Sequence, residues 1–112
     1  MRTSRTNFDR LEARRDRRYA QPLLTVAIDG QDYASDNWSL GGFQLTAKLP
    51  VEPGTIVTGM LRIDGADGFP FSAAVVRRDE AAGVIAFRFH NLSPLALGKL
   101  DRALARRLVR RR

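Results

Sequence analysis

The sequence predicts an all-β fold followed by one helix: a six-stranded antiparallel β-barrel, closed or nearly closed, with a basic N-terminal arm and a C-terminal α-helix. Three observations lead to this prediction. Short segments alternate apolar and polar residues, which is the pattern of strands with one buried face. Turn-forming residues separate these segments, and leucines at helical spacing follow the last of them. We expect a barrel rather than an open sheet because closure removes exposed strand edges.

Six segments are expected to form strands, five of them because apolar and polar residues alternate. They are residues 24–28, a polar segment that continues through Tyr33, and residues 42–49, 57–63, 69–75 and 85–89. Asp29-Gly30 predicts a tight hairpin turn between the first two segments. Residues 37–42 form a polar connection between the second and third strands, and alternation there directs Trp38 into the barrel.

The helix is expected to begin at Ser93-Pro94, because serine is a favourable N-cap and proline is tolerated at the first helical position. Four leucines then share one face of the helix: Leu97, Leu100, Leu104 and Leu108. We expect this stripe to pack against the barrel. The chain therefore divides into a basic N-terminal arm (residues 1–18), the β-barrel (residues 19–92) and the packed C-terminal helix (residues 93–112).

Length and composition exclude several classes of function. A chain of 112 residues fits one domain, it contains no cysteine, and His90 is its only histidine. Disulfides, thiol catalysis, cysteine-ligated metals and a His-rich metal centre are thereby excluded. No residues suggest a catalytic set, so we expect no enzyme activity and no metal site. No apolar run reaches the length of a membrane span or a secretory signal, so we expect a cytoplasmic protein without membrane insertion.

The positive charge is concentrated at the two ends of the chain. The formal net charge is +7, to which residues 1–18 contribute +4 and residues 94–112 contribute +6, whereas residues 19–93 carry a net charge of −3. A protein that binds duplex DNA over its whole surface would be basic throughout. This distribution instead favours capture of a compact anion or of an acidic partner.

Two short motifs lie on either side of the first two strands. Arg14 and Arg18 have the spacing R-x-x-x-R just before the first strand, and residues 37–42 read N-x-S-x-x-G. The order of arm, polar turn, barrel and closing helix resembles the PilZ domain family, whose fold is a split β-barrel of six strands. The resemblance covers most of the chain. Asn37 stands where that family more often has Asp.

The resemblance implies binding of the bacterial second messenger cyclic di-GMP and coupling of its occupancy to an unidentified effector protein, with no separate cofactor. The residues expected to bind the ligand are Arg14, Arg15, Arg18, Asn37, Ser39, Gly41 and Gly42. Their chemistry suits the ligand, because an arginine fork can pair with phosphate oxygens or with guanine O6 and N7 and can stack on the base. Gly41 and Gly42 allow close backbone approach or a positive φ.

Three alternatives remain open at this stage. A shifted arm register, Arg17-x-x-x-Gln21, would lose the second arginine. A PilZ-like adaptor that does not bind the nucleotide would act through protein contact alone. A nucleic-acid binder would use the basic arm, although we do not expect nucleic acid as the partner. The aromatic residues of the last strands could imitate the stacking platform of an RNA-binding sheet, but core packing explains them more simply.

Overall fold

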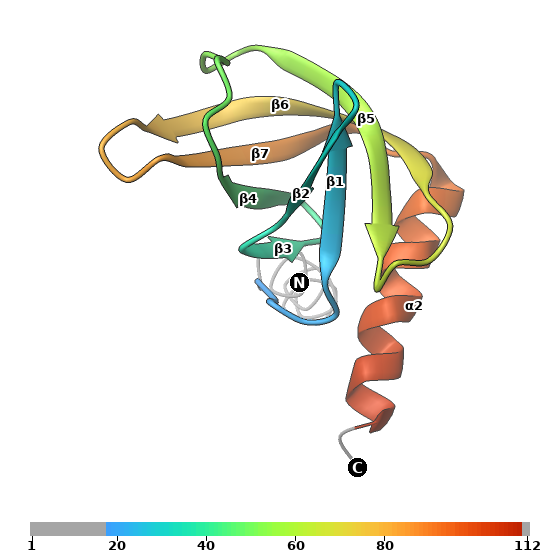
Figure 1. Ribbon diagram of the computed structural model, residues 1–112. Coiled ribbons are helices and arrows are strands. Elements are labelled where there is room, and N and C mark those ends of the chain that lie inside the picture. Colours follow the sequence, from blue (N-terminus) through green and yellow to red (C-terminus); the bar gives the residue numbers. More distant parts are fainter. Residues whose placement is uncertain (1–17, 111–112) are drawn as a thin grey trace, which may run out of the picture.

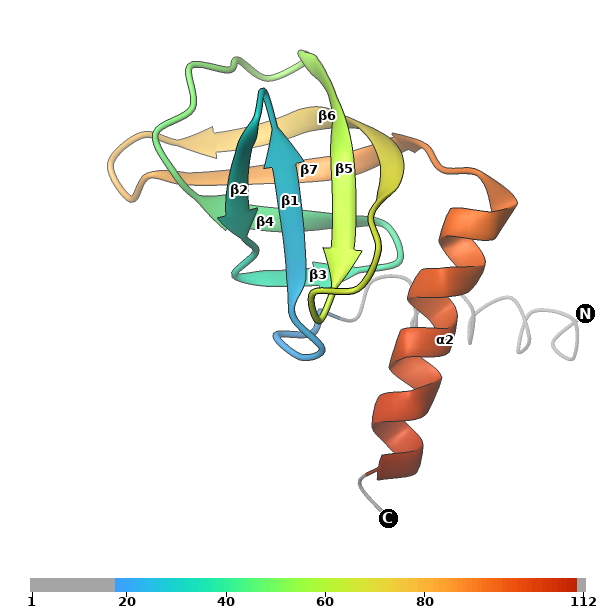
Figure 2. The same cartoon turned by 45° about the vertical axis from the view of Figure 1, so that its right-hand side comes forward.

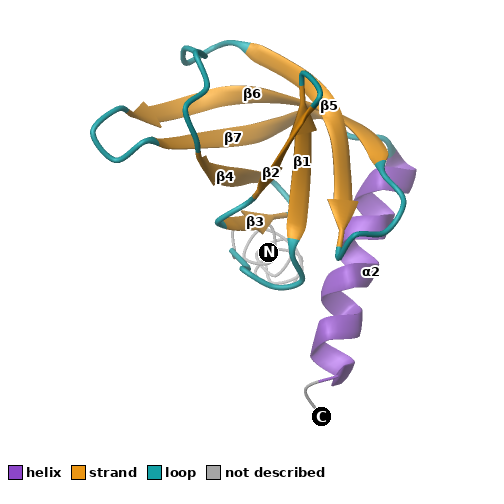
Figure 3. Cartoon of the chain, in the orientation of Figure 1, coloured by secondary structure: helices purple, strands orange, loops and turns teal. Residues whose placement is uncertain are grey.

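The computed structural model describes residues 18–110, which form one antiparallel sheet and one long helix (Figures 1 and 3). The described part of the chain contains seven strands, not the six that were predicted. They are β1 (Leu24–Ile28), β2 (Gln31–Ala34), β3 (Asn37–Ser39), β4 (Gly42–Thr46), β5 (Ile56–Ile63), β6 (Phe69–Asp79) and β7 (Val84–Asn91). The helix is α2 (Pro94–Arg110).

The sheet curls into a half-barrel with the strand order β2-β1-β5-β6-β7-β4-β3 (Figure 2). Its end strands β2 and β3 do not pair with each other, so the closed barrel is not formed. The chain itself connects the two ends. The Ser35 amide donates to the Leu24 carbonyl of β1 at 2.9 Å, and the next amide, Asp36, donates to the Gln44 carbonyl of β4 at 2.8 Å. Two consecutive residues thus join opposite ends of one sheet.

The additional strand is β3, a stretch that was predicted to be a polar turn. It is only three residues long and too short to show a periodicity, but it pairs with β4 over its whole length. Trp38 is fully buried between Asn37 and Ser39, which confirms the inward direction predicted for its side chain. Strand bounds also differ elsewhere, because β4 ends at Thr46 and β6 continues to Asp79.

The core lies inside the curl and consists of the inward residues of the strands, as the alternating pattern predicted. Phe43 stacks on Phe87 with ring centroids 4.7 Å apart and meets Phe71 edge-on at 5.6 Å. Both geometries are favourable for aromatic pairs. The predicted Asp29-Gly30 hairpin is present, and both of its residues have positive φ, at 52° and 79°. Positive φ at both central positions is the requirement of a type I′ hairpin turn.

The helix begins as predicted. The Ser93 hydroxyl accepts a hydrogen bond from the Ala96 amide at 3.1 Å, which is the contact of an N-cap. Leu100 and Leu104 are buried and extend the core, and Ala96 and Ala103 widen this face beyond the predicted leucines. Lys99 lies 5.4 Å from the centre of the Phe69 ring on β6. Beyond this contact the helix extends past the end of the barrel (Figure 2). In the described chain, no helix is long and apolar enough to cross a membrane.

Candidate functional site

The site begins where the chain enters the sheet, beside the edge strand β3. Tyr19 exchanges two backbone hydrogen bonds with Trp38, of 2.7 and 2.8 Å, and so lies antiparallel to β3. The Trp38 indole Nε1 donates to the carbonyl of Pro22 at 2.7 Å. These bonds attach residues 19–22 to β3 through both its backbone and its buried side chain. They place the preceding residue, Arg18, outside the sheet and next to β3.

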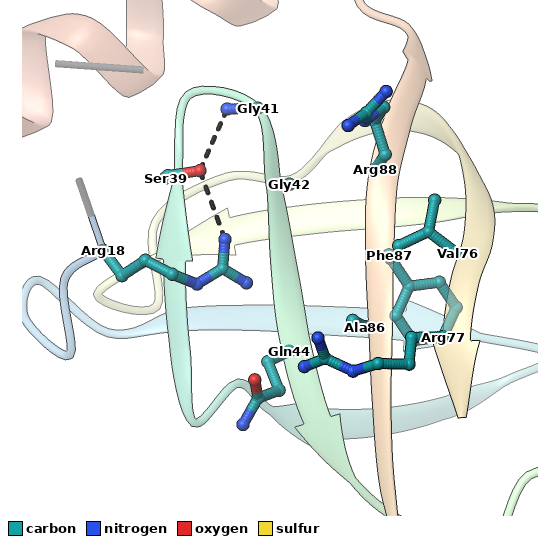
Figure 4. A pocket seen from close by; sticks show the side chains of 10 residues that line it. All are labelled: Arg18, Ser39, Gly41, Gly42, Gln44, Val76, Arg77, Ala86, Phe87 and Arg88. Carbon is teal, nitrogen blue, oxygen red and sulfur yellow. Dashed lines mark hydrogen bonds between the residues drawn. The ribbon is translucent and has the colours of Figure 1, made fainter. Parts of the chain in front are cut away.

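Arg18 connects the two motifs that were singled out in the sequence. Its Nε donates to Asn37 Oδ1 at 2.6 Å, and its Nη1 donates to Ser39 Oγ at 3.4 Å. The Ser39 hydroxyl also accepts from the Gly41 amide at 3.1 Å (Figure 4). Because Trp38 points into the core, its neighbours Asn37 and Ser39 must point outward, toward the arginine. The guanidinium group keeps N–H donors that none of these contacts uses.

Strand register extends this site across the outer face of the sheet in two adjacent rows of paired residues. The first row runs through Asn37, Gln44, Ala86 and Arg77, and the second runs through Ser39, Gly42, Arg88, Ala74 and Ile56. Both rows start at the side chains that contact Arg18. In each row a small residue, Ala86 in the first and Gly42 in the second, is followed by an arginine, Arg77 or Arg88, so the rows leave a depression between Arg18 and these two cations.

Gly42 occupies the floor of this depression for a steric reason. A Cβ atom added there would overlap the carbonyl oxygen of Phe87 on β7. Gly42 is not one of the residues with positive φ, so the positive φ offered as one of its two roles is wrong, and the close approach that the structure shows is that of the β7 backbone. Any larger residue would force β4 and β7 apart.

The depression is a cavity of about 330 Å³. Its lining comes from β3, β4, β6, β7 and the chain before β1: Arg18, Ser39, Gly41, Gly42, Gln44, Val76, Arg77, Ala86, Phe87 and Arg88 (Figure 4). No carboxylate is among these residues. Partial burial lowers the pKa of Arg18, and the nearby positive charge of Arg77 lowers it further. Arginine nevertheless stays charged at neutral pH, so the cavity presents cationic groups to whatever enters it.

Five of the predicted site residues are therefore brought together at one place: Arg18, Asn37, Ser39, Gly41 and Gly42. Arg14 and Arg15 lie outside the described residues, as does Arg17 of the alternative register. Gln21, the other position of that register, does not line the cavity.

Gln44, Arg77 and Arg88 line the cavity but belong to neither motif, so the motifs did not indicate them as site residues. A signal for Arg77 was nevertheless present. If the alternation of Phe71, Ala73 and Val75 continued, Arg77 would point into the apolar core. Such a conflict between periodicity and charge indicates a β-bulge, and β6 has a register shift against β7 between Val75 and Arg77.

The described residues contain no group of three or more His, Cys, Asp or Glu that could hold a metal ion. The charged side chains at this site are guanidinium groups, which bind anions and stack on planar groups. The fold and the site together define a small β-domain with an arginine-lined cavity on the outer face of its sheet.

Comparison with known proteins agrees with this description. The family model of the PilZ domain matches residues 9–106, so the chain belongs to the PilZ domain family. Among solved structures, the Bacillus subtilis Inhibitor of motility (MotI/DgrA) has the same fold, with a TM-score of 0.63 and 17% sequence identity. The match covers 81% of this chain and 49% of that one, so this chain spans about half the length of that protein. No curated protein matches the sequence significantly.

Proposed function

We propose that this chain is a receptor domain for cyclic di-GMP and that the ligand binds in the cavity beside β3. The observation that best supports the proposal is the contact of Arg18 with Asn37 and Ser39. These residues come from two motifs about twenty positions apart, and they are joined by hydrogen bonds of 2.6 and 3.4 Å at the rim of one cavity. Membership of the PilZ family supports the choice of ligand.

The ligand carries two phosphodiester charges and two guanine bases. Arg18 can offer its remaining N–H donors to a phosphate or to a guanine edge, and its planar face can stack on a base. The Asn37 side chain holds Arg18 through Oδ1, and its amide nitrogen can donate to the ligand. The Gly41-Gly42 backbone has no side chain to prevent close approach. We assign Arg14 and Arg15 to the same ligand.

We further propose that the protein acts as a receptor and adaptor rather than as an enzyme. Guanidinium groups stay protonated at neutral pH, so the charged groups of this cavity can bind an anion but cannot serve as general bases or nucleophiles. The output would then be contact with an effector protein. That the structural neighbour is named as an inhibitor of motility supports a regulatory role for the fold.

Titration calorimetry tests the proposal. The purified chain is titrated with cyclic di-GMP, and GTP and a short DNA duplex serve as controls. We expect saturable binding of cyclic di-GMP and weaker binding of GTP, because GTP offers one guanine base where cyclic di-GMP offers two bases and two separate phosphodiesters. A folded protein that binds none of the three would favour the adaptor that acts by protein contact alone. Binding of the duplex alone, weakened steeply by salt, would favour nucleic acid.

A further inference from the structure

The wall of the cavity opposite Arg18 carries two arginines that belong to neither sequence motif. We infer that Arg77 and Arg88 extend the anion-binding site beyond the two motifs: one phosphate lies between Arg18 and Arg77, and Arg88 supplies the cation for a second phosphate. This inference rests on the proposed function for the identity of the ligand, but the anion position itself follows from the strands.

A bulge turns Arg77 into the cavity. Phe71, Ala73 and Val75 point into the core and are at most 4% exposed. Regular alternation would bury Arg77 next. The register shift between Val75 and Arg77 instead sets Arg77 opposite Ala86 on the outer face, and it leaves Val76 unpaired and 50% exposed. Bulges commonly re-aim a side chain next to a binding site.

Charge pairing separates these arginines from the others on the barrel. Arg62 pairs with Asp32 at 3.2 Å, and Arg78 pairs with Glu52 at 3.7 Å. Arg18, Arg77 and Arg88 form no ion pair with any carboxylate of residues 18–110, and all three line the same cavity. The barrel arginines that lack an acidic partner within the described chain are thus the ones that face this space. Like charges brought together without a counter-ion favour an anion between them.

The floor between the cations is low enough for a ligand to reach them. Gly42 is paired with Arg88, and Ala86 is paired with Arg77, so a small residue lies beside each of these arginines. Figure 4 shows Arg18 and Arg77 extending toward the same region from opposite sides, beside Gln44. Arg88 lies farther along β7, opposite Gly42. A phosphate between Arg18 and Arg77 could accept paired N–H donors from both forks.

The first test uses inorganic pyrophosphate and does not depend on guanine recognition. The Nε–Hε signals of the arginine side chains are followed by NMR during the titration. We expect the signals of Arg18, Arg77 and Arg88 to shift together with one saturation curve, whereas Arg62, which is paired with Asp32 outside the cavity, stays unchanged. If the Arg77 and Arg88 signals shift no more than the Arg62 signal, the inference is wrong.

The second test measures cyclic di-GMP affinity by calorimetry for Arg77→Ala, Arg88→Ala, Arg77→Lys and the control Arg62→Ala. Loss of a charge-assisted contact predicts affinities about ten- to a hundred-fold weaker for the two cavity alanine variants. Arg77→Lys should recover part of the loss, because it keeps the charge but not the fork. Arg62→Ala should bind like the parent, and unchanged melting curves would show that all four variants fold.

The two hypotheses fail in different ways. If the parent chain binds cyclic di-GMP and both Arg77→Ala and Arg88→Ala bind it equally well, this extension of the anion-binding site is refuted and the receptor function stands. If pyrophosphate shifts the three signals but cyclic di-GMP does not bind, the anion position stands and the proposed ligand is wrong.

Discussion

Arg18 joins the arm to the sheet through side-chain contacts alone, and this makes it the most informative residue for substitution. It is held by Asn37 and Ser39 at the rim of the cavity, and it has no apolar role in the core. Water can replace the guanidinium group at Asn37, and the buried Ser39 hydroxyl keeps its hydrogen bond from the Gly41 amide, so loss of Arg18 leaves little buried and unsatisfied. Substitution of Arg18 should therefore change ligand affinity and leave the stability of the fold almost unchanged.

Arg18→Ala should weaken cyclic di-GMP binding about ten- to a hundred-fold, as expected for loss of a charged hydrogen-bond donor at a phosphate or base edge. The melting temperature should change little. Arg14→Ala, measured beside it, tests the predicted arm register, and Arg62→Ala is the matched control. Unchanged affinity in both Arg14→Ala and Arg18→Ala would remove the R-x-x-x-R motif from the site.

Gly42 should be sensitive to the smallest possible substitution. Gly42→Ala places a Cβ against the Phe87 carbonyl and should destabilise the fold by about 1–3 kcal/mol, the usual cost of overpacking. The matched control is Gly98→Ala in α2, where the nearest atom to an added Cβ is the end of the Arg102 side chain at 3.8 Å. That change should stabilise the helix by about 0.5–1 kcal/mol. Urea denaturation of both variants measures the difference, and equal stability would contradict the steric argument.

At the scale of elements, β3 connects the core to the candidate site. One face of this short strand contributes Trp38 to the core, while the other presents Asn37 and Ser39 to Arg18. The edge of β3 that faces away from β4 pairs with Tyr19, and the Trp38 indole donates to the Pro22 carbonyl. The three residues of β3 therefore fix the position of the chain before β1 relative to the side chains of Asn37 and Ser39.

Trp38→Phe should loosen this connection, because it removes the 2.7 Å hydrogen bond to a buried carbonyl and leaves unfilled volume. An unsatisfied buried acceptor costs about 1–3 kcal/mol, so the melting temperature should fall. Hydrogen exchange at residues 19–23 should rise more than exchange in β5 and β6. As a control, Phe71→Leu alters the core on β6 and should not raise exchange selectively at residues 19–23. If both variants affect residues 19–23 equally, Trp38 has no special role in holding them.

At the scale of the whole molecule, the local charge of the site differs from the charge of the barrel that carries it. Residues 19–93 have a net charge of −3, yet three arginines gather at one cavity on their outer face and at its rim. The excess positive charge lies at the two ends of the chain. A dianionic ligand at this cavity would therefore be attracted both by the site and by the basic arm that precedes it.

Ligand binding should increase the hydrogen-exchange protection of residues 8–18, because a dianion between the arm and β3 would offset part of the positive charge of the arm and fix its path. The core strands β1, β5 and β6 should be equally protected with and without cyclic di-GMP. Arg18→Ala should abolish the increase at the same ligand concentration. Equal protection of the arm in both states of the parent would mean that the signal passes through α2 or through ligand-induced association instead.

The sequence by itself determined the features that depend on neighbouring residues. Alternation located the core faces of five strands, Asp29-Gly30 located a hairpin, and Ser93-Pro94 located the start of the helix. Each of these signals acts within a few residues, so no knowledge of distant pairing is required. The two motifs also identified Arg18, Asn37 and Ser39 as candidate site residues, although about twenty positions separate the arginine from the other two.

Tertiary structure alone decided β3, the pairing register of the bulge before Arg77 and the cavity. A three-residue strand is defined by its partner β4, since its own length shows no period. The outward direction of Arg77 depends on its register against β7, and Arg88 joins the site because β7 lies beside β4. Gly42 must be glycine because the Phe87 carbonyl, forty-five positions later in the chain, occupies the space of its Cβ. These features come from pairing between distant segments, which local sequence patterns do not encode.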